Sequence, residues 1–137
     1  MVTTALSTIV SDIESQKTVK KQADLMQKHD SPALKELLIF SCCPVVEWQL
    51  PSGNPPYTPL AEGTDQEGRF YSQVKKLDYF VNTPKGLELN SMKKEQMFIE
   101  LMETIDPGDA KLLLRMKEKK LKIKKEALQQ VYPGESW

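Results

Sequence analysis

The stretch that decides the fold is residues 30–44, which reads DSPALKELLIFSCCP. Ser31 can cap a helix, and Pro32 suits the first helical position because its missing N–H would have no partner there. The apolar residues that follow form an arc too wide for a surface helix. They are Leu34, Leu37, Leu38, Ile39, Phe40 and Cys42. Pro44 ends the helix. We therefore predict a buried helix at the centre of the molecule.

On both sides of this segment, apolar residues recur with the spacing of amphipathic helices. The further helices that we expect lie near residues 6–13, 19–28, 66–81, 91–105, 106–116 and 124–131. No internal repeat divides the chain, and its 137 residues suit one core. The sequence thus predicts an all-α fold, a compact bundle of about six to seven short helices in a single domain spanning 1–137.

The connection between the central helix and the next one is long. Residues 45–50 are expected to be extended, and residues 51–68 form a loop rich in Pro and Gly. Loops longer than about 15 residues inside compact domains tend to be functional or disordered. A second connector is expected over residues 82–90, which contain Pro84 and Gly86.

Charge is distributed unevenly along the chain. The formal net charge is zero, with 19 basic and 19 acidic side chains, which argues against a strongly cationic coat for nucleic acid. Residues 111–125, however, carry eight basic residues against Glu118 alone, a net charge of +7, and leave −7 for the rest. The basic C-terminal helical segment, residues 109–131, is therefore the candidate for contact with a polyanion.

On a helix, Lys111, Arg115, Lys119 and Lys122 would fall within one narrow arc, because they step by four, four and three residues. Such a row can neutralise several phosphates without reading base sequence. The complete set of candidate nucleic-acid-binding residues is Lys17, Lys20, Lys21, Lys111, Arg115, Lys119, Lys120, Lys122 and Lys124. The opposing interpretation is a solvated helix face.

Five segments, taken in their order along the chain, carry a resemblance to a known family. They are Lys17-Thr18-Val19-Lys20-Lys21, the Asp30–Leu38 helix, residues 109–116 (DAKLLLRM), Lys120-Leu121 and Val131-Tyr132-Pro133-Gly134. In this order they resemble the N-terminal all-helical DNA-binding domain of phage-type ATP-dependent DNA ligases. The chain is also similar to small uncharacterised proteins of large tailed phages, cyanophages in particular. The resemblance implies a ligase DNA-binding-domain-like fold and a phage accessory protein that binds duplex DNA with low sequence specificity.

The chain departs from that family in two ways. The lysine-centred nucleotidyl-transfer motif is missing, as is the length to house its domain, so the resemblance does not extend to ligation. The segment between Leu121 and Pro133 also lacks the glycine of the ligase turn that approaches the minor groove.

Catalytic and metal-binding motifs are missing from the sequence. His29 is the single histidine, at a predicted helix end, and no CxxC, HExxH or Gly-rich phosphate loop is present. We expect no enzyme activity, no cofactor and no metal. The N-terminus lacks the features of a secretory signal, and no apolar run reaches the roughly 18 residues of a membrane span. The expected location is the cytoplasm of the host cell.

A protein-binding adaptor is the alternative function. Zero net charge suits a partner such as a phage or host RNA polymerase, a replisome or a virion component. Aromatic anchors dominate many interfaces. The candidates are Trp48, Tyr57 and the C-terminal Trp137. The favoured interpretation of Trp48 is packing over the core, and Trp137 is expected to be exposed, either docked on a partner or frayed.

Overall fold

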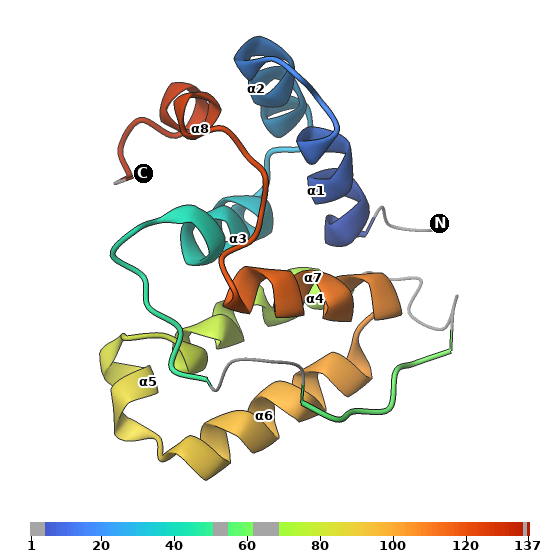
Figure 1. The fold of residues 1–137 in the computed structure, drawn as a ribbon, viewed down its shortest axis with the longest axis vertical. Coiled ribbons are helices and arrows are strands. Elements are labelled where there is room, and N and C mark those ends of the chain that lie inside the picture. The colour runs from blue at the N-terminus through green and yellow to red at the C-terminus, as the bar shows by residue number, and fades with distance from the viewer. Residues whose placement is uncertain (1–4, 51–54, 62–68, 136) are drawn as a thin grey trace.

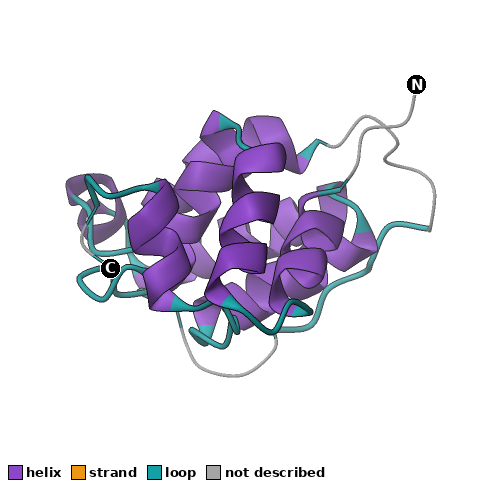
Figure 2. Ribbon diagram, turned by 90° about the horizontal axis from the view of Figure 1, so that it is seen from above, coloured by secondary structure: helices purple, strands orange, loops and turns teal. Residues whose placement is uncertain are grey.

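The computed structural model describes residues 5–50, 55–61, 69–135 and 137, and in these ranges the secondary structure is helical apart from one isolated β-bridge. Figures 1 and 2 show the arrangement. The elements are α1 (Leu6–Glu14), α2 (Val19–Lys28), α3 (Pro32–Cys42), α4 (Phe70–Gln73), the 3-10 helix η1 (Val74–Phe80), α5 (Pro84–Glu88), α6 (Ser91–Thr104), α7 (Pro107–Lys117) and α8 (Lys125–Val131). The prediction of an all-α fold is confirmed.

The helices form two groups that meet at α3 and α7. In Figure 1, α1, α2 and α8 lie in the upper half, and α5 and α6 lie at the bottom. Helix α2 packs against α8, and α1 packs against both α2 and α7. In the lower half α6 packs on α7, while η1 contacts α3, α5 and α6. Chain segments more than 100 residues apart are thereby joined in one body.

The buried position predicted for the central helix is confirmed. Leu34, Leu37 and Leu38 of α3 are fully buried. Burying a leucine side chain contributes roughly 1.5–3 kcal/mol. The start of α3 is also as predicted, because the Ser31 hydroxyl accepts a hydrogen bond from the Leu34 N–H at 3.1 Å. Helix α3 touches both η1 and α7, so it supports the two halves of the molecule.

A carboxylate near the start of α7 connects two helices. Asp109 lies in the first turn of α7, where a carboxylate favours the positive end of the helix dipole. It is completely buried, and its Oδ1 accepts a hydrogen bond from the Ser7 N–H of α1 at 2.9 Å. A single carboxylate therefore stabilises the N-termini of two helices that are 102 residues apart.

Two predicted boundaries differ from the structure. The helix expected over residues 66–81 is helical from Phe70 and becomes a 3-10 helix at Val74, while residues 62–68 lie outside the described residues. The expected connector 82–90 contains α5, because Thr83 caps a turn whose first residue is Pro84. Of the long loop 51–68, residues 55–61 are non-helical coil.

The extended segment predicted over residues 45–50 begins only after a turn at residues 44–45, and it pairs with the chain at the end of η1. Trp48 and Val81 form an isolated antiparallel bridge. The Gln49 N–H donates to the Phe80 carbonyl at 2.7 Å, and the Asn82 N–H donates to the Glu47 carbonyl at 2.9 Å. This pairing holds the chain that leaves α3 against the lower half of the molecule.

We expect Gly86→Ala to destabilise the protein by roughly 1–3 kcal/mol, because a Cβ at this position would lie 1.9 Å from the Val81 carbonyl oxygen. A backbone atom has little freedom to move aside. Urea unfolding followed by circular dichroism measures the change. Gly134→Ala is the matched control, since a Cβ there meets no atom within 4 Å. Equal stability of the two variants would contradict the close packing of α5 on η1.

Candidate nucleic-acid interface

The predicted cationic row on one helix is wrong, because α7 ends at Lys117. Lys119 adopts a left-handed conformation, with φ of 58°. The Lys119 and Lys120 N–H groups donate to the Met116 and Arg115 carbonyls, each at 3.0 Å. This is the Schellman pattern that closes a helix C-terminus. This position usually holds glycine, so the lysine there gives no signal in the sequence that the helix ends.

An extended segment, residues 120–124, follows this turn and joins α7 to α8; we call it the basic strap. Leu121 and Ile123 are half-buried and pack against the core, whereas Lys120, Lys122 and Lys124 are exposed. Alternate residues of an extended chain point to opposite sides, about 6.6 Å apart for every second residue. The predicted helical segment 109–131 is therefore two helices joined by a strap that carries three outward lysines.

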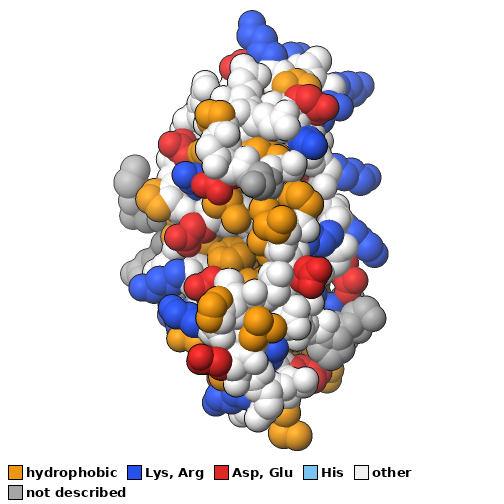
Figure 3. Space-filling model, turned by 90° about the vertical axis from the view of Figure 1, so that its left-hand side faces the viewer, with side chains coloured by type: hydrophobic (Ala, Val, Ile, Leu, Met, Phe, Trp, Pro, Cys, Tyr) orange, Lys and Arg blue, Asp and Glu red, His pale blue; other side chains and the backbone are white. Residues whose placement is uncertain are grey.

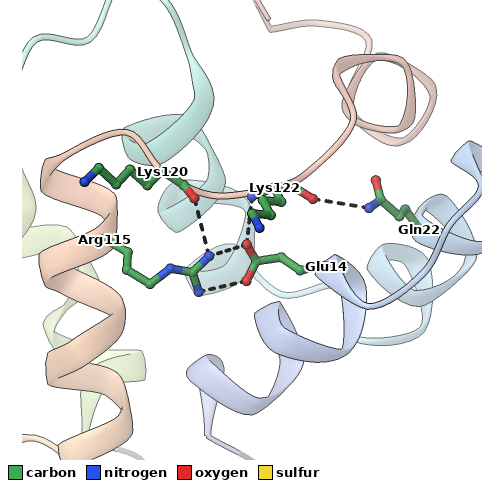
Figure 4. Close-up of polar contacts among 5 residues, drawn as sticks. All are labelled: Glu14, Gln22, Arg115, Lys120 and Lys122. Atoms are coloured by element: carbon green, nitrogen blue, oxygen red, sulfur yellow. Dashed lines mark hydrogen bonds and ion pairs between the residues drawn. The ribbon is translucent and has the colours of Figure 1, made fainter.

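The strap is held through its backbone by two side chains from α1 and α2 (Figure 4). Gln22 is only 1% exposed. Its Oε1 accepts from the Lys124 N–H at 2.8 Å, and its Nε2 donates to the Lys122 carbonyl at 3.4 Å. Glu14 Oε2 accepts from the Lys122 N–H at 2.7 Å. Because these contacts use main-chain groups, they leave the lysine side chains outside.

Arg115 belongs to this support and is not a free phosphate contact. Its guanidinium pairs with Glu14 through two hydrogen bonds, Nη1 to Oε1 at 2.9 Å and Nη2 to Oε2. Nη2 also donates to the Lys120 carbonyl at 3.4 Å. The hydrogen bond with Glu14 raises the pKa of Arg115 above its ordinary value. Glu14 thus connects α1, the end of α7 and the strap.

Two further lysines of the basic segment are also engaged within the fold. Lys119 Nζ donates to the Cys43 carbonyl at 2.8 Å, at the C-terminus of α3. Burial lowers the pKa of this ammonium below its ordinary value. Lys117 is buried and pairs with Glu118 at 2.7 Å. Lys119 therefore anchors the turn before the strap, which corrects its predicted place in a cationic row.

The other predicted cations remain available. Their side chains are exposed and form no hydrogen bond or ion pair with any residue that the structure describes. They are Lys17, Lys20, Lys21, Lys111, Lys120, Lys122 and Lys124. Gln22 Nε2 also donates to the Gln16 carbonyl at 3.4 Å, so the turn that carries Lys17 lies beside Lys122. Lys111 lies six residues before the end of α7, apart from the strap.

The strap faces the viewer in Figure 1, where it passes in front of α3. Figure 3, turned so that this face lies at the right, shows Lys and Arg side chains projecting along that edge. Hydrophobic side chains gather in the middle of the adjoining face. Several exposed cations close together can neutralise phosphates, which is the chemistry that a backbone-binding surface needs.

The aromatic anchors predicted for a protein interface are largely engaged within the fold. Trp48 is half-buried, and its Nε1 donates to the Phe40 carbonyl at 2.9 Å. Tyr57 is half-buried against the core. The expectation that Trp137 is exposed is wrong: it is 9% exposed, and its Nε1 donates to the Tyr132 carbonyl at 2.8 Å. An indole N–H that finds a backbone acceptor can be buried at little cost.

The described residues contain no group of three His, Cys, Asp or Glu side chains placed to hold a metal ion. Within the same ranges no helix has the length and apolar character to cross a membrane. Neither Cys42 nor Cys43 forms a disulfide, and burial raises the pKa of Cys42 to about 11. The Cys42 thiol is therefore protonated at neutral pH and is a poor nucleophile.

Sequence reasoning missed Glu14 and Gln22, the two residues that position the strap. A signal for Gln22 existed, because it lies on the apolar face of α2 with Ala23 and Met26. A polar side chain at a core position needs a hydrogen-bond partner. That requirement indicated a buried contact, but its partner, 100 residues away, is defined only by the fold.

Fold and site together define a small all-α protein with a basic strap across one face. The chain belongs to the family of unknown function DUF6433, whose model matches residues 9–123. The matched region includes α2, α3 and most of the strap, together with Glu14 and Gln22. No curated protein matches the chain.

We expect Glu14→Gln to lower stability by about 1–2 kcal/mol, because the amide can replace only part of the hydrogen bonding to Arg115 and Lys122. The expected loss is small because the Arg115 side chain is 42% exposed, and solvent weakens its interaction with Glu14. Chemical denaturation provides the measurement. Asp12→Asn removes a carboxylate from an exposed position of the same helix and should have little effect. A Glu14 variant as stable as the Asp12 variant would show that the hydrogen bonds of Glu14 to Arg115 and Lys122 do not stabilise the protein.

Replacing Lys119 by glycine or by alanine separates its backbone strain from its side-chain contact. Both changes remove the hydrogen bond to Cys43, but only glycine adopts a left-handed conformation without cost. Lys119→Gly should therefore be more stable than Lys119→Ala by roughly 1 kcal/mol. Thermal unfolding of the pair measures this difference. The same melting temperature for both would argue against the left-handed turn at the end of α7.

Proposed function

We propose that this protein binds the phosphate backbone of duplex DNA, with low sequence specificity, through the basic strap and the neighbouring Lys17, Lys20 and Lys21. The observation that carries the proposal is the row of Lys120, Lys122 and Lys124 on a backbone that Glu14 and Gln22 hold in place. Three exposed ammonium groups carried by one short segment can neutralise neighbouring phosphates of a nucleic-acid strand.

Pre-organisation strengthens this proposal. Binding orders flexible segments at a cost in conformational entropy, and a segment that is already held loses less. The strap has a helix at each end, and Glu14 and Gln22 hold its backbone. Only the lysine side chains then need to be ordered on binding.

Zero net charge is compatible with this role because the relevant field is local. Exposed charges farther apart than about 8–10 Å are largely screened at physiological ionic strength. The exposed lysines of the strap therefore act on a nearby phosphate more than distant carboxylates do. The resemblance to ligase DNA-binding domains and to small phage proteins supports the further proposal of a non-catalytic phage accessory protein.

A protein-binding adaptor that acts on RNA polymerase, replisome or virion components is our second proposal. Trp48 and Trp137 use their N–H groups inside the fold, so other side chains would have to form the contact surface. The observation in its favour is the exposure of Val45, Leu87 and Met92, at 67%, 62% and 80%. Recovery of a defined protein partner that binds wild type but not a Leu87→Asp variant would support it.

The nucleic-acid proposal predicts a salt-dependent affinity for duplex DNA that the strap lysines dominate. The variant Lys120→Gln/Lys122→Gln/Lys124→Gln should reduce the slope of log K against log salt by about 2.7, since each phosphate contact contributes about 0.9. Fluorescence anisotropy with a labelled duplex measures both affinity and slope.

The matched control replaces three exposed lysines outside the strap, Lys75, Lys76 and Lys93, with glutamine. It changes net charge equally and should retain most of the affinity. If the wild-type protein shows no duplex binding at low salt, the proposal is wrong. If the two triple variants lose affinity equally, the strap is not the binding surface.

A further inference from the structure

A hollow of about 270 Å³ lies beside the basic strap, on the side away from its lysines. It lies between the C-terminal end of α3, the strap, α8 and the C-terminal residue. Its lining residues are Cys42, Pro44, Ile123, Lys125, Leu128 and Trp137. None of the contacts described above for Glu14 and Gln22 involves this hollow, so it is a separate feature beside the strap.

The lining is mostly apolar and includes the aromatic residue Trp137. Its volume falls below the roughly 300–1,000 Å³ of sites for drug-sized ligands. A hollow of this size suits one planar ring better than a whole cofactor. Lys125 is the one cation among the lining residues, and the Cys42 thiol is protonated, so the walls favour a flat and largely uncharged group.

The strap connects this hollow to the lysine row. Ile123 lines the hollow, and its neighbours Lys122 and Lys124 are exposed and point to the opposite side of the strap. Figure 3 shows hydrophobic side chains in the middle of the face that adjoins the strap and cationic side chains along its right-hand edge. A ligand that combines negative charges with a flat ring a short distance away fits both parts together.

We propose that the hollow takes an unstacked nucleobase from a strand whose phosphates lie on the basic strap. The inference rests on the proposed function and adds to it that nucleic acid with unpaired bases is bound through bases as well as phosphates. Stacking on aromatic and apolar side chains tolerates every base, because each has a π-face. The hollow therefore adds affinity for an unpaired strand without adding sequence specificity.

The test compares a labelled oligothymidylate with a duplex of the same length, using the full chain. Ile123→Phe places a larger side chain in the hollow and should weaken oligothymidylate binding roughly tenfold while leaving duplex binding unchanged. Leu121→Phe is the matched control, since it enlarges a half-buried residue of the same strap outside the hollow. It should leave both affinities unchanged.

A second measurement does not depend on how well the Ile123 variant folds. In a Trp48→Phe background Trp137 is the single tryptophan, and stacking of a base in the hollow should quench its fluorescence at saturating oligothymidylate. Unchanged Trp137 fluorescence, or equal loss of both affinities in Ile123→Phe, overturns this inference and leaves the duplex proposal standing. Failure of the wild-type protein to bind either nucleic acid overturns both.

Discussion

The arrangement of the basic segment depends on the hydrogen bonds that Glu14 and Gln22 form with the backbone of the strap. An extended segment outside a β-sheet leaves its N–H and C=O groups without ladder partners, and burying them unpaired is costly. Here a carboxylate and a carboxamide supply partners at residues 122 and 124. The same carboxylate neutralises Arg115, so the end of α7 and the strap are held by one group.

The cationic residues of the basic segment have two different roles. Some support the fold, and the others are exposed to solvent. Arg115, Lys117 and Lys119 bond to groups of the protein itself, whereas Lys120, Lys122 and Lys124 face solvent. The number of lysines in a segment is thus a poor guide to how many can meet a ligand. Whether a lysine can contact a ligand depends on whether a carboxylate or a free carbonyl of the protein lies within reach of its ammonium group after folding.

The hydrophobic pattern was a reliable guide wherever a helix buries its own face against the core. Helix α3 shows this, because its leucines are buried by any packing that covers a helix with so wide an apolar arc. The cap at Ser31 was also predictable, since its hydroxyl bonds to an N–H three residues away in the same helix. The burial of Trp137 could not be predicted, because its indole N–H reaches the Tyr132 carbonyl only when the chain turns back after α8.

The sequence by itself determined the all-α class, the central helix and the position of the positive charge along the chain, because these follow from local spacing and composition. Only the tertiary structure decided that Arg115 and Lys119 are engaged within the fold, since their partners Glu14 and Cys43 lie 101 and 76 residues away. The end of α7 at a left-handed lysine belongs to the same category. Its cost is offset by contacts with α1, α2 and α3, and no local pattern encodes contacts between segments so distant in the chain.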